Sequence, residues 1–141
     1  MFRKIDERIY VSPQVSPADI ADAAALGVTH IINNRPDEEE AGQPSSESIA
    51  AAALAAGLGY TAIPVTHSGF SHAQVDAMAA ALEQARGPVL AYCRSGTRST
   101  YLWALARAKL GDHPAVLTEQ AEAAGYDLRA IRPMLDALAA G

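Results

Sequence analysis

The chain has 141 residues, half of them apolar, and a formal net charge of −5 at pH 7. This length suits one domain with a packed core, because domains commonly run to about 100–150 residues. The acidic balance argues against a nucleic-acid partner, which would need clustered Lys and Arg, and the single cysteine excludes an intramolecular disulfide or a Cys-rich zinc site.

The sequence also predicts no secretory signal and no membrane partner. The opening segment MFRKIDERIY is charged and lacks an apolar core. The longest apolar stretch, residues 49–59, is alanine-rich and shorter than the about 20 residues that a membrane span needs. We therefore expect a cytoplasmic protein with a reduced thiol, folded as one domain over residues 1–141.

Strand and helix signals alternate from the first residues onward. Residues 8–12 (RIYVS) indicate a short strand, and residues 28–33 (VTHIIN) indicate a buried one. Between them, Ser16 is placed as an N-cap, Pro17 at the first helical position and Gly27 as the stop signal. The pattern predicts a strand, a helix and a second strand.

The same alternation continues through the middle of the chain. A second helix is expected to begin near residues 45–46 and to end at residues 57–59, before a third strand at residues 60–65 (YTAIPV). Ser71 and Gln74 then have the spacing of a capping box, which predicts the start of a third helix.

The fourth strand, residues 88–93 (PVLAYC), leads directly into a polar loop, and helices are expected at about residues 98–110, 118–124 and 128–139. Strands separated by helices predict an α/β fold of three layers (α/β/α), with a mainly parallel sheet covered on both faces. Ligands of such sheets bind at the carboxyl ends of the strands, which is where Cys93 lies.

The loop CRSGTRS, residues 93–99, has the composition of an anion-binding turn. Gly96 lets the backbone turn tightly with its amides pointing inward, and the next helix begins near Arg98. Amide donors, the helix dipole and Arg98 would all favour the thiolate form of Cys93. A lone cysteine at a strand end is often only a small buried hydrophobic residue, but this polar loop favours a nucleophile.

Other side chains of the loop have candidate roles in binding an anion. Arg98 would hold an anionic substrate or brace the loop, and Arg94 would either attract anions at the mouth or remain a solvated surface residue. Hydroxyl groups that would donate to a bound anion, or merely cap the helix, are those of Ser95, Thr97 and Ser99.

A second polar segment, NNRPDEEE at residues 33–40, follows the second strand and should reach the same edge of the sheet. Arg35 would add positive potential to the site or pair with the acidic run behind it. Asp37 is a spare carboxylate, and thus one candidate general acid. Residues 38–40 are predicted to be a solvated loop.

The segment after the third strand, residues 66–71, contains His67 and is a candidate lid. His67 and His72 without a carboxylate pattern make a poor metal site, so we expect no metal and no cofactor. Trp103 and Leu110, on the helix after the loop, are predicted to be core residues, and residues 124–133 (AGYDLRAIRP) are assigned to packing only.

The motif AYCRSGTRS resembles the active-site loops of rhodanese-type sulfurtransferases and, more loosely, the phosphate loop of cysteine-dependent tyrosine phosphatases. Together with GVTHIINNRPDEE, GQPS, YTAIPV, LWALA and AGYDL, it makes residues 5–134 similar to the phosphatase-like domain of beta-lactamase hydrolase-like proteins. This resemblance implies the cysteine-based tyrosine-phosphatase fold, with the cysteine loop at the carboxyl edge. It also implies a candidate partner, a metallo-β-lactamase-fold persulfide dioxygenase, to which relatives are fused.

Three departures from the phosphatase pattern favour a different reaction. Phosphatases use C-x5-R, whereas Arg98 makes this loop C-x4-R and leaves Ser99 where their arginine would fall. His67 stands where dual-specificity phosphatases carry their general acid, whose contribution is about 10²–10⁴-fold. Tyr92 replaces the histidine that commonly precedes the cysteine.

A shorter ring suits a persulfide sulfur, and sulfur transfer needs no strong acid. The main prediction is therefore a sulfurtransferase that carries a persulfide on Cys93, with thiosulfate or a glutathione persulfide as its anionic donor. The first alternative is a phosphatase that hydrolyses phosphate monoesters through a phosphocysteine. The second alternative is a non-catalytic module that binds anions or carries sulfur.

Overall fold

The computed structural model describes residues 2–141. The elements alternate along the chain, and two of them open it as a hairpin. The strands are β1 (Arg3–Asp6), β2 (Ile9–Ser12), β3 (His30–Asn33), β4 (Gly59–Ala62) and β5 (Val89–Tyr92). The helices are α1 (Pro17–Ala25), α2 (Ser46–Ala55), α3 (His72–Gln84), α4 (Thr97–Lys109), α5 (Pro114–Ala123) and α6 (Arg132–Ala140), with a 3₁₀ turn at Arg129–Ile131.

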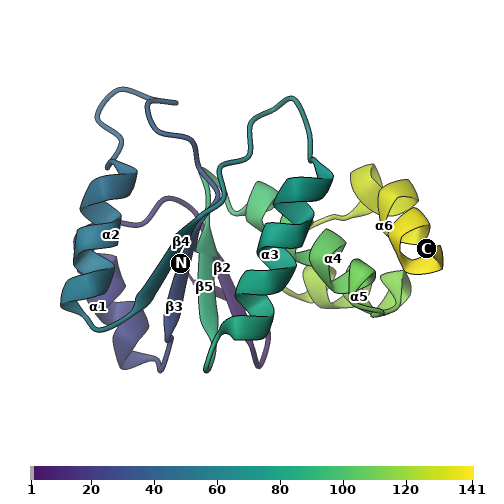
Figure 1. Cartoon of the computed structure of the whole chain (residues 1–141), viewed down its shortest axis with the longest axis horizontal. Coiled ribbons are helices and arrows are strands. Elements are labelled where there is room, and N and C mark those ends of the chain that lie inside the picture. Colours follow the sequence, from purple (N-terminus) through teal and green to yellow (C-terminus); the bar gives the residue numbers. More distant parts are fainter. Residues whose placement is uncertain (1) are drawn as a thin grey trace.

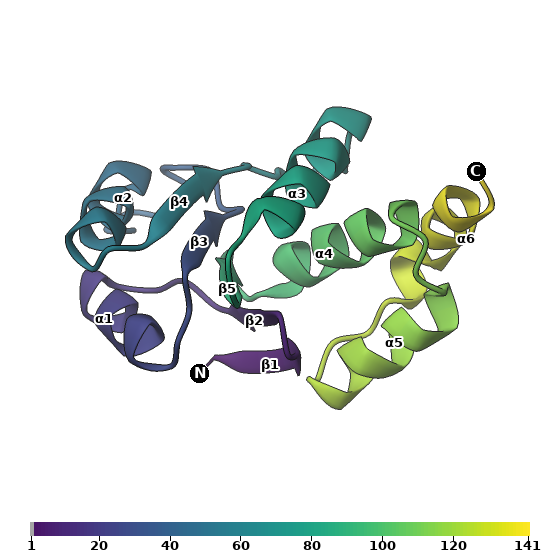
Figure 2. The same cartoon turned by 60° about the horizontal axis from the view of Figure 1, so that its bottom comes forward.

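The five strands form one sheet in the order β1-β2-β5-β3-β4. β2, β5, β3 and β4 run parallel, and only β1 pairs antiparallel, with β2. Helices α1 and α2 cover one face of the sheet and α3 to α6 cover the other (Figures 1 and 2). The predicted three-layer α/β fold with a mainly parallel sheet is confirmed.

Alternation along the central strands explains why both faces are covered. Successive strand residues point to opposite faces, so Ile31 and Leu90 pack under α1 and α2 while Ile32 and Ala91 pack under the larger helical layer. Every residue of β5 is buried. A strand buried on both faces reads as a continuous apolar run, as β5 does. Trp103 lies in the core as predicted.

Local signals set most of the helix boundaries. The capping boxes of Ser16 with Asp19 and of Ser71 with Gln74 both form. The sequence placed the start of α5 too late, at residue 118, whereas Pro114 occupies its first turn, a position that proline favours. The prediction that Leu110 is a core residue was wrong, because this residue is 37% exposed at the end of α4.

The third predicted strand is shorter than expected but keeps its direction. β4 ends at Ala62, yet the amides of Ile63 and Val65 still bond the carbonyls of Asn33 and Asn34 at 2.9 Å. This extension places Val65 beside the residues that follow β3.

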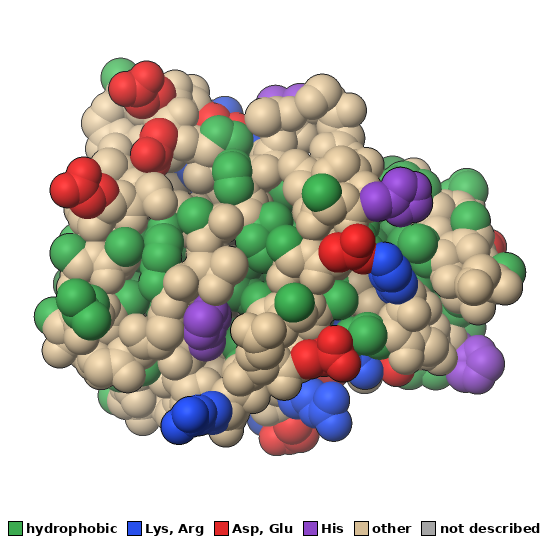
Figure 3. Space-filling view, viewed as in Figure 1, with side chains coloured by type: hydrophobic (Ala, Val, Ile, Leu, Met, Phe, Trp, Pro, Cys, Tyr) green, Lys and Arg blue, Asp and Glu red, His purple; other side chains and the backbone are tan. Residues whose placement is uncertain are grey.

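The outer surface of the helical layers is mixed in character. On the face shown in Figure 3, acidic, basic and apolar side chains are interspersed, with no large patch of one sign on that face. Within residues 2–141, no helix combines the length and the apolarity needed to cross a membrane.

Candidate active site

The candidate site lies where β5 and β3 end side by side. Asn33 pairs with Tyr92 in the parallel register, so the segments that begin at Asn34 and Cys93 leave the sheet together. The amide of Asn34 donates to the Tyr92 carbonyl at 2.8 Å, and the amide of Cys93 donates to the Ser12 carbonyl at 3.3 Å. Cys93 is fully buried. The two polar segments singled out in the sequence therefore meet at one edge of the sheet.

A left-handed glycine closes the loop around the thiol. Gly96 has φ of +93° and is the N-cap of α4, a conformation that glycine adopts without steric cost. Its amide donates to Cys93 Sγ at 3.1 Å. The sulfur thus sits at the N-terminus of α4 and accepts a backbone N–H.

The hydroxyl groups of the loop make local bonds. Ser95 Oγ donates to Thr97 Oγ1 at 3.0 Å and accepts from the Thr97 amide at 3.3 Å, so these two side chains satisfy the start of the helix. Ser99 is buried and donates to Asn34 Oδ1 at 2.8 Å, which ties α4 to the end of β3. Ser99 therefore braces the two polar segments against each other.

Arg98 is held rigidly beside the thiol. Its Nη1 donates to Glu39 Oε2 at 2.7 Å and to the Val65 carbonyl at 2.6 Å, and its Nη2 donates to Glu39 Oε1 at 2.8 Å. The hydrogen bond to Glu39 is the main cause that raises the pKa of Arg98, and the Cys93 sulfur adds to the rise.

The remaining donors of Arg98 form one ready binding edge. A guanidinium has five N–H groups in a fixed fork, and the bonds to Glu39 and Val65 use three of them. The other two, on Nε and Nη2, share the opposite edge and match the spacing of two oxygens of an anion. Arg98 can therefore bind Glu39 and an oxyanion at the same time.

Glu39 joins the buried Arg35 to the largely buried Arg98. Besides its two bonds to Arg98, Glu39 Oε1 accepts from Arg35 Nε at 2.9 Å. These bonds, the one to Arg98 first, lower the pKa of Glu39 to about 2. The prediction of a solvated loop at residues 38–40 was wrong for Glu39, whose side chain is only 17% exposed. Three consecutive acidic residues give no signal as to which one turns inward.

Arg35 pairs with the acidic run, one of the two alternatives that the sequence left open. It is buried, donates through Nη1 to Gln14 Oε1 at 3.0 Å, and lies 3.6 Å from a Glu40 carboxylate oxygen. Arg94 is exposed and also lies near Glu40, at 3.5 Å. Three guanidinium groups thus pair with two carboxylates of the acidic run.

The two candidate acids occupy different settings. Asp37 is exposed, and its Oδ1 accepts from the Ser46 amide at 2.7 Å, so it is engaged at the start of α2. His67 is exposed in the turn that follows Val65 and Thr66. The Val65 carbonyl accepts a hydrogen bond from Arg98, and His67 follows Val65 by two residues.

Tyr126 is a site residue that the sequence analysis missed. Its hydroxyl donates to the Ser95 carbonyl at 3.2 Å. The sequence assigns residues 124–133 to packing only, whereas Tyr126 reaches Ser95 from the connection after α5, 31 positions away in sequence. The motif AGYDL was the only signal, and nothing in it indicated contact with the cysteine loop.

Comparison with protein families places this chain among phosphatase-like domains. Residues 1–110 match the model of the beta-lactamase hydrolase-like protein, phosphatase-like domain. A beta-lactamase hydrolase-like protein of Agrobacterium fabrum is 40% identical over 105 residues, which cover 74% of this chain and 24% of that protein. One from Xylella fastidiosa is 40% identical over 101 residues, covering 72% and 23%. The chain spans about a quarter of the length of these curated relatives.

Solved structures share the fold over nearly the whole chain. A candidate phosphatase from Neisseria meningitidis has a TM-score of 0.84 and 40% identity, covering 96% of both chains. A cysteine-to-serine variant of P. aeruginosa TpbA in complex with pTyr has a TM-score of 0.68 and 18% identity, covering 99% of this chain and 88% of that one. At such low identity the second likeness concerns the fold alone, and the predicted tyrosine-phosphatase-type fold is confirmed.

Proposed function

Because the chain belongs to the phosphatase-like domain family of beta-lactamase hydrolase-like proteins, we propose that it is a cysteine-dependent phosphatase of phosphate monoesters. The observation that carries the proposal is the cradle around Cys93: a backbone N–H on Sγ, the N-terminus of α4, and the unused edge of Arg98. Family membership reverses the order that the sequence suggested and puts phosphate hydrolysis ahead of sulfur transfer.

In the first step the Cys93 thiolate attacks the phosphorus atom of the ester. The S–P bond forms as the P–O bond to the alcohol breaks, and the leaving oxygen takes up a proton. The loop amides and the free edge of Arg98 stabilise the charge that develops on the phosphoryl oxygens. Glu39 keeps Arg98 in place, so the fork does not reorganise during the reaction.

The proton for the leaving group has one better-placed source. Asp37 is already bonded to the Ser46 amide, whereas His67 is exposed and follows Val65, the ligand of Arg98. His67 is therefore the proposed general acid. Without a carboxylic acid in this role, the enzyme should favour aryl phosphates, because a phenolate leaves more readily than an alkoxide.

In the second step water attacks the phosphocysteine. The S–P bond breaks, inorganic phosphate leaves, and the electron pair returns to Cys93 as thiolate. Glu39 has no part in activating this water, since two guanidiniums hold its pKa at about 2 and both its oxygens accept hydrogen bonds from arginine.

Sulfur transfer remains the second candidate because of one specific observation. The C-x4-R ring is one residue short, and Ser99, at the phosphatase arginine position, is bonded to Asn34 and unavailable to an anion. In this reaction the thiolate attacks the outer sulfur of thiosulfate and releases sulfite, leaving a persulfide on Cys93. A thiol or cyanide then takes that sulfur. A fused or separate persulfide dioxygenase is the partner that would use the product.

A side-by-side assay of the reduced protein tests both candidates. One arm follows hydrolysis of a small aryl phosphate, and the other follows sulfur transfer from thiosulfate to cyanide, each with Cys93→Ser as the control. The phosphatase proposal predicts hydrolysis that Cys93→Ser abolishes. Hydrolysis that survives Cys93→Ser, or sulfur transfer without any hydrolysis, would overturn it, and the latter outcome would establish the sulfurtransferase.

A further inference from the structure

One peptide unit connects Tyr126 to the thiol. Tyr126 Oη donates to the Ser95 carbonyl at 3.2 Å, and the N–H of the same peptide, on Gly96, donates to Cys93 Sγ at 3.1 Å. In a trans peptide the C=O and N–H point in opposite directions. A group that holds the oxygen on one side therefore fixes the direction of the hydrogen on the other.

We infer that Tyr126 is a positioning residue for the Cys93 nucleophile, which it serves by holding the Ser95–Gly96 peptide with its N–H directed at Sγ. Tyr126 lies outside the residues that match the family model, 1–110. It reaches the loop from the C-terminal segment that contains α5 and α6. That segment therefore does more than cover the sheet.

The Ser95–Gly96 peptide needs such a restraint because of its glycine. Gly96 has φ of +93°, and glycine populates positive and negative φ about equally well, so the peptide before it can turn over at little cost. A turned peptide would aim its carbonyl oxygen at the sulfur and would repel both a thiolate and a bound anion. A Cβ on Gly96 would also overlap the Tyr126 hydroxyl, so a substitution of Gly96 that restricted the backbone would clash with Tyr126.

Tyr126 is itself anchored on the opposite side. The Tyr126 amide donates to the Ala121 carbonyl at 2.8 Å, and Arg3 Nη1 donates to the Ala124 carbonyl at 2.9 Å. The Arg3 guanidinium also lies 5.7 Å from the centre of the Tyr126 ring. The hairpin β1–β2 and the end of α5 thus support the hydroxyl from behind.

The hydroxyl stays protonated in the range where the thiolate acts. Burial raises the pKa of Tyr126 above its ordinary value, and the Cys93 sulfur adds to the rise against the opposing effect of Arg3. The hydroxyl is therefore a donor at neutral pH, which its bond to the Ser95 carbonyl requires.

The test is Tyr126→Phe, which removes one oxygen and keeps the ring, with Tyr10→Phe on β2 as the matched control. The inference rests on the proposed function only in taking Cys93 as the nucleophile. Two readouts separate a failure of this inference from a failure of the proposed function. One is the ultraviolet absorbance of the thiolate as a function of pH, corrected with Cys93→Ser, and the other is the steady-state hydrolysis of an aryl phosphate. Because the chain has a single cysteine, the thiolate signal belongs to Cys93 alone.

We expect Tyr126→Phe to move the midpoint of thiolate formation to higher pH. It should also lower kcat by roughly three- to tenfold, the factor for one net hydrogen bond, with KM almost unchanged. Tyr10→Phe should change neither, and both variants should unfold close to the wild-type temperature. A shifted midpoint in a protein that never hydrolyses phosphate would support the inference while refuting the phosphatase. An unshifted midpoint, with kcat retained or with only KM raised, would overturn the inference.

Discussion

Helix α4 carries an arginine–carboxylate pair at each end, and the two pairs differ in what they hold together. At the amino end, Arg98 binds Glu39, which is 59 positions away, and both side chains are largely buried. At the carboxyl end, Arg107 binds Asp112, only five positions away, with the carboxylate 40% exposed. In each pair, the hydrogen bond to the carboxylate raises the pKa of the arginine.

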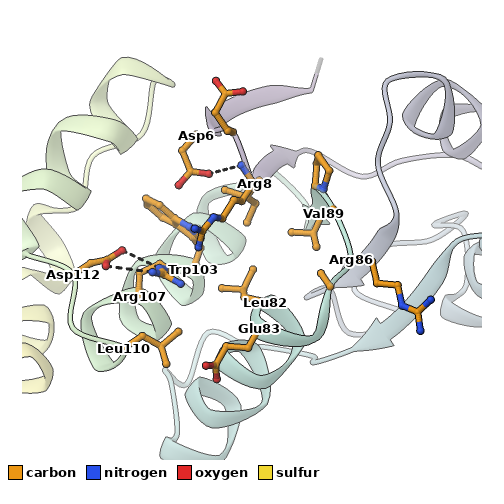
Figure 4. A pocket seen from close by; sticks show the side chains of 15 residues that line it. Asp6, Arg8, Leu82, Glu83, Arg86, Val89, Trp103, Arg107, Leu110 and Asp112 are labelled. Carbon is orange, nitrogen blue, oxygen red and sulfur yellow. Dashed lines mark hydrogen bonds and ion pairs between the residues drawn. The ribbon is translucent and has the colours of Figure 1, made fainter.

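The surroundings of the two pairs differ even more. Arg107 lies in the wall of a cavity of about 960 Å³ at the amino end of β5, lined by side chains that include Leu82, Val89 and Trp103 (Figure 4). Among residues 2–141, no cysteine, serine or threonine lines that large cavity, whereas the fully buried Cys93 lies beside Arg98. Converging hydrogen-bond donors, rather than the size of a cavity, therefore distinguish the end of the sheet that carries the candidate site.

The largest expected difference concerns activity. Arg98→Lys should lower kcat/KM for an aryl phosphate by about 10²–10³-fold, because an ammonium cannot bind Glu39 and a phosphoryl edge at once. Arg107→Lys should change it less than about twofold, since this arginine only closes the end of α4. Steady-state kinetics on both folded variants measure this contrast, and equal losses would contradict it.

The next difference concerns stability. Glu39→Gln leaves Arg35 and Arg98 buried without their shared carboxylate, so the free energy of unfolding should fall by about 3 kcal/mol. Asp112→Asn should cost less than about 1 kcal/mol, because its carboxylate is partly solvated. Urea denaturation of both variants gives the two values. Equal losses in the two variants would mean that burial does not increase the contribution of the Arg98–Glu39 pair to stability.

The same pair predicts a dependence of stability on acid. The folded pKa of Glu39 is about 2 and its ordinary value is 4.5, so the folded state binds fewer protons between these values. The stabilisation is complete above about pH 4.5 and is lost as the pH falls toward about 2. Stability measured across this range should fall less steeply in Glu39→Gln than in the wild type. Asp112→Asn, which retains Glu39, should keep the wild-type slope.

The smallest effect is expected at the opposite edge of the sheet. Burial lowers the pKa of His30, which begins β3 and bonds Thr61 Oγ1 through Nε2 at 2.7 Å. The neutral form is favoured in the folded state, so stability is complete above the ordinary pKa of 6.5 and declines as the pH falls below it. Thermal unfolding of His30→Gln should show a weaker decline just below pH 6.5. A decline equal to that of the wild type would mean that His30 is not its source.

The parts of the molecule that the sequence predicted have local causes. The capping boxes at Ser16 and Ser71 each involve residues three positions apart, so a linear pattern contains the whole interaction. β5 followed by Gly96 indicated where the thiol would lie, because an apolar strand and a left-handed turn residue are both visible in sequence. β1 was missed because a four-residue edge strand with two exposed charged residues has no apolar period.

The sequence alone predicted the order of elements from β2 onward and the position of the cysteine loop at the carboxyl end of β5. The partners that complete the loop emerge only in the folded structure: Glu39 from a run of three acidic residues, and Tyr126 from the C-terminal segment. The physical reason is range. Caps and turns are set by neighbours in the chain, whereas these two contacts span 59 and 31 positions and exist only once the sheet and its helices have packed.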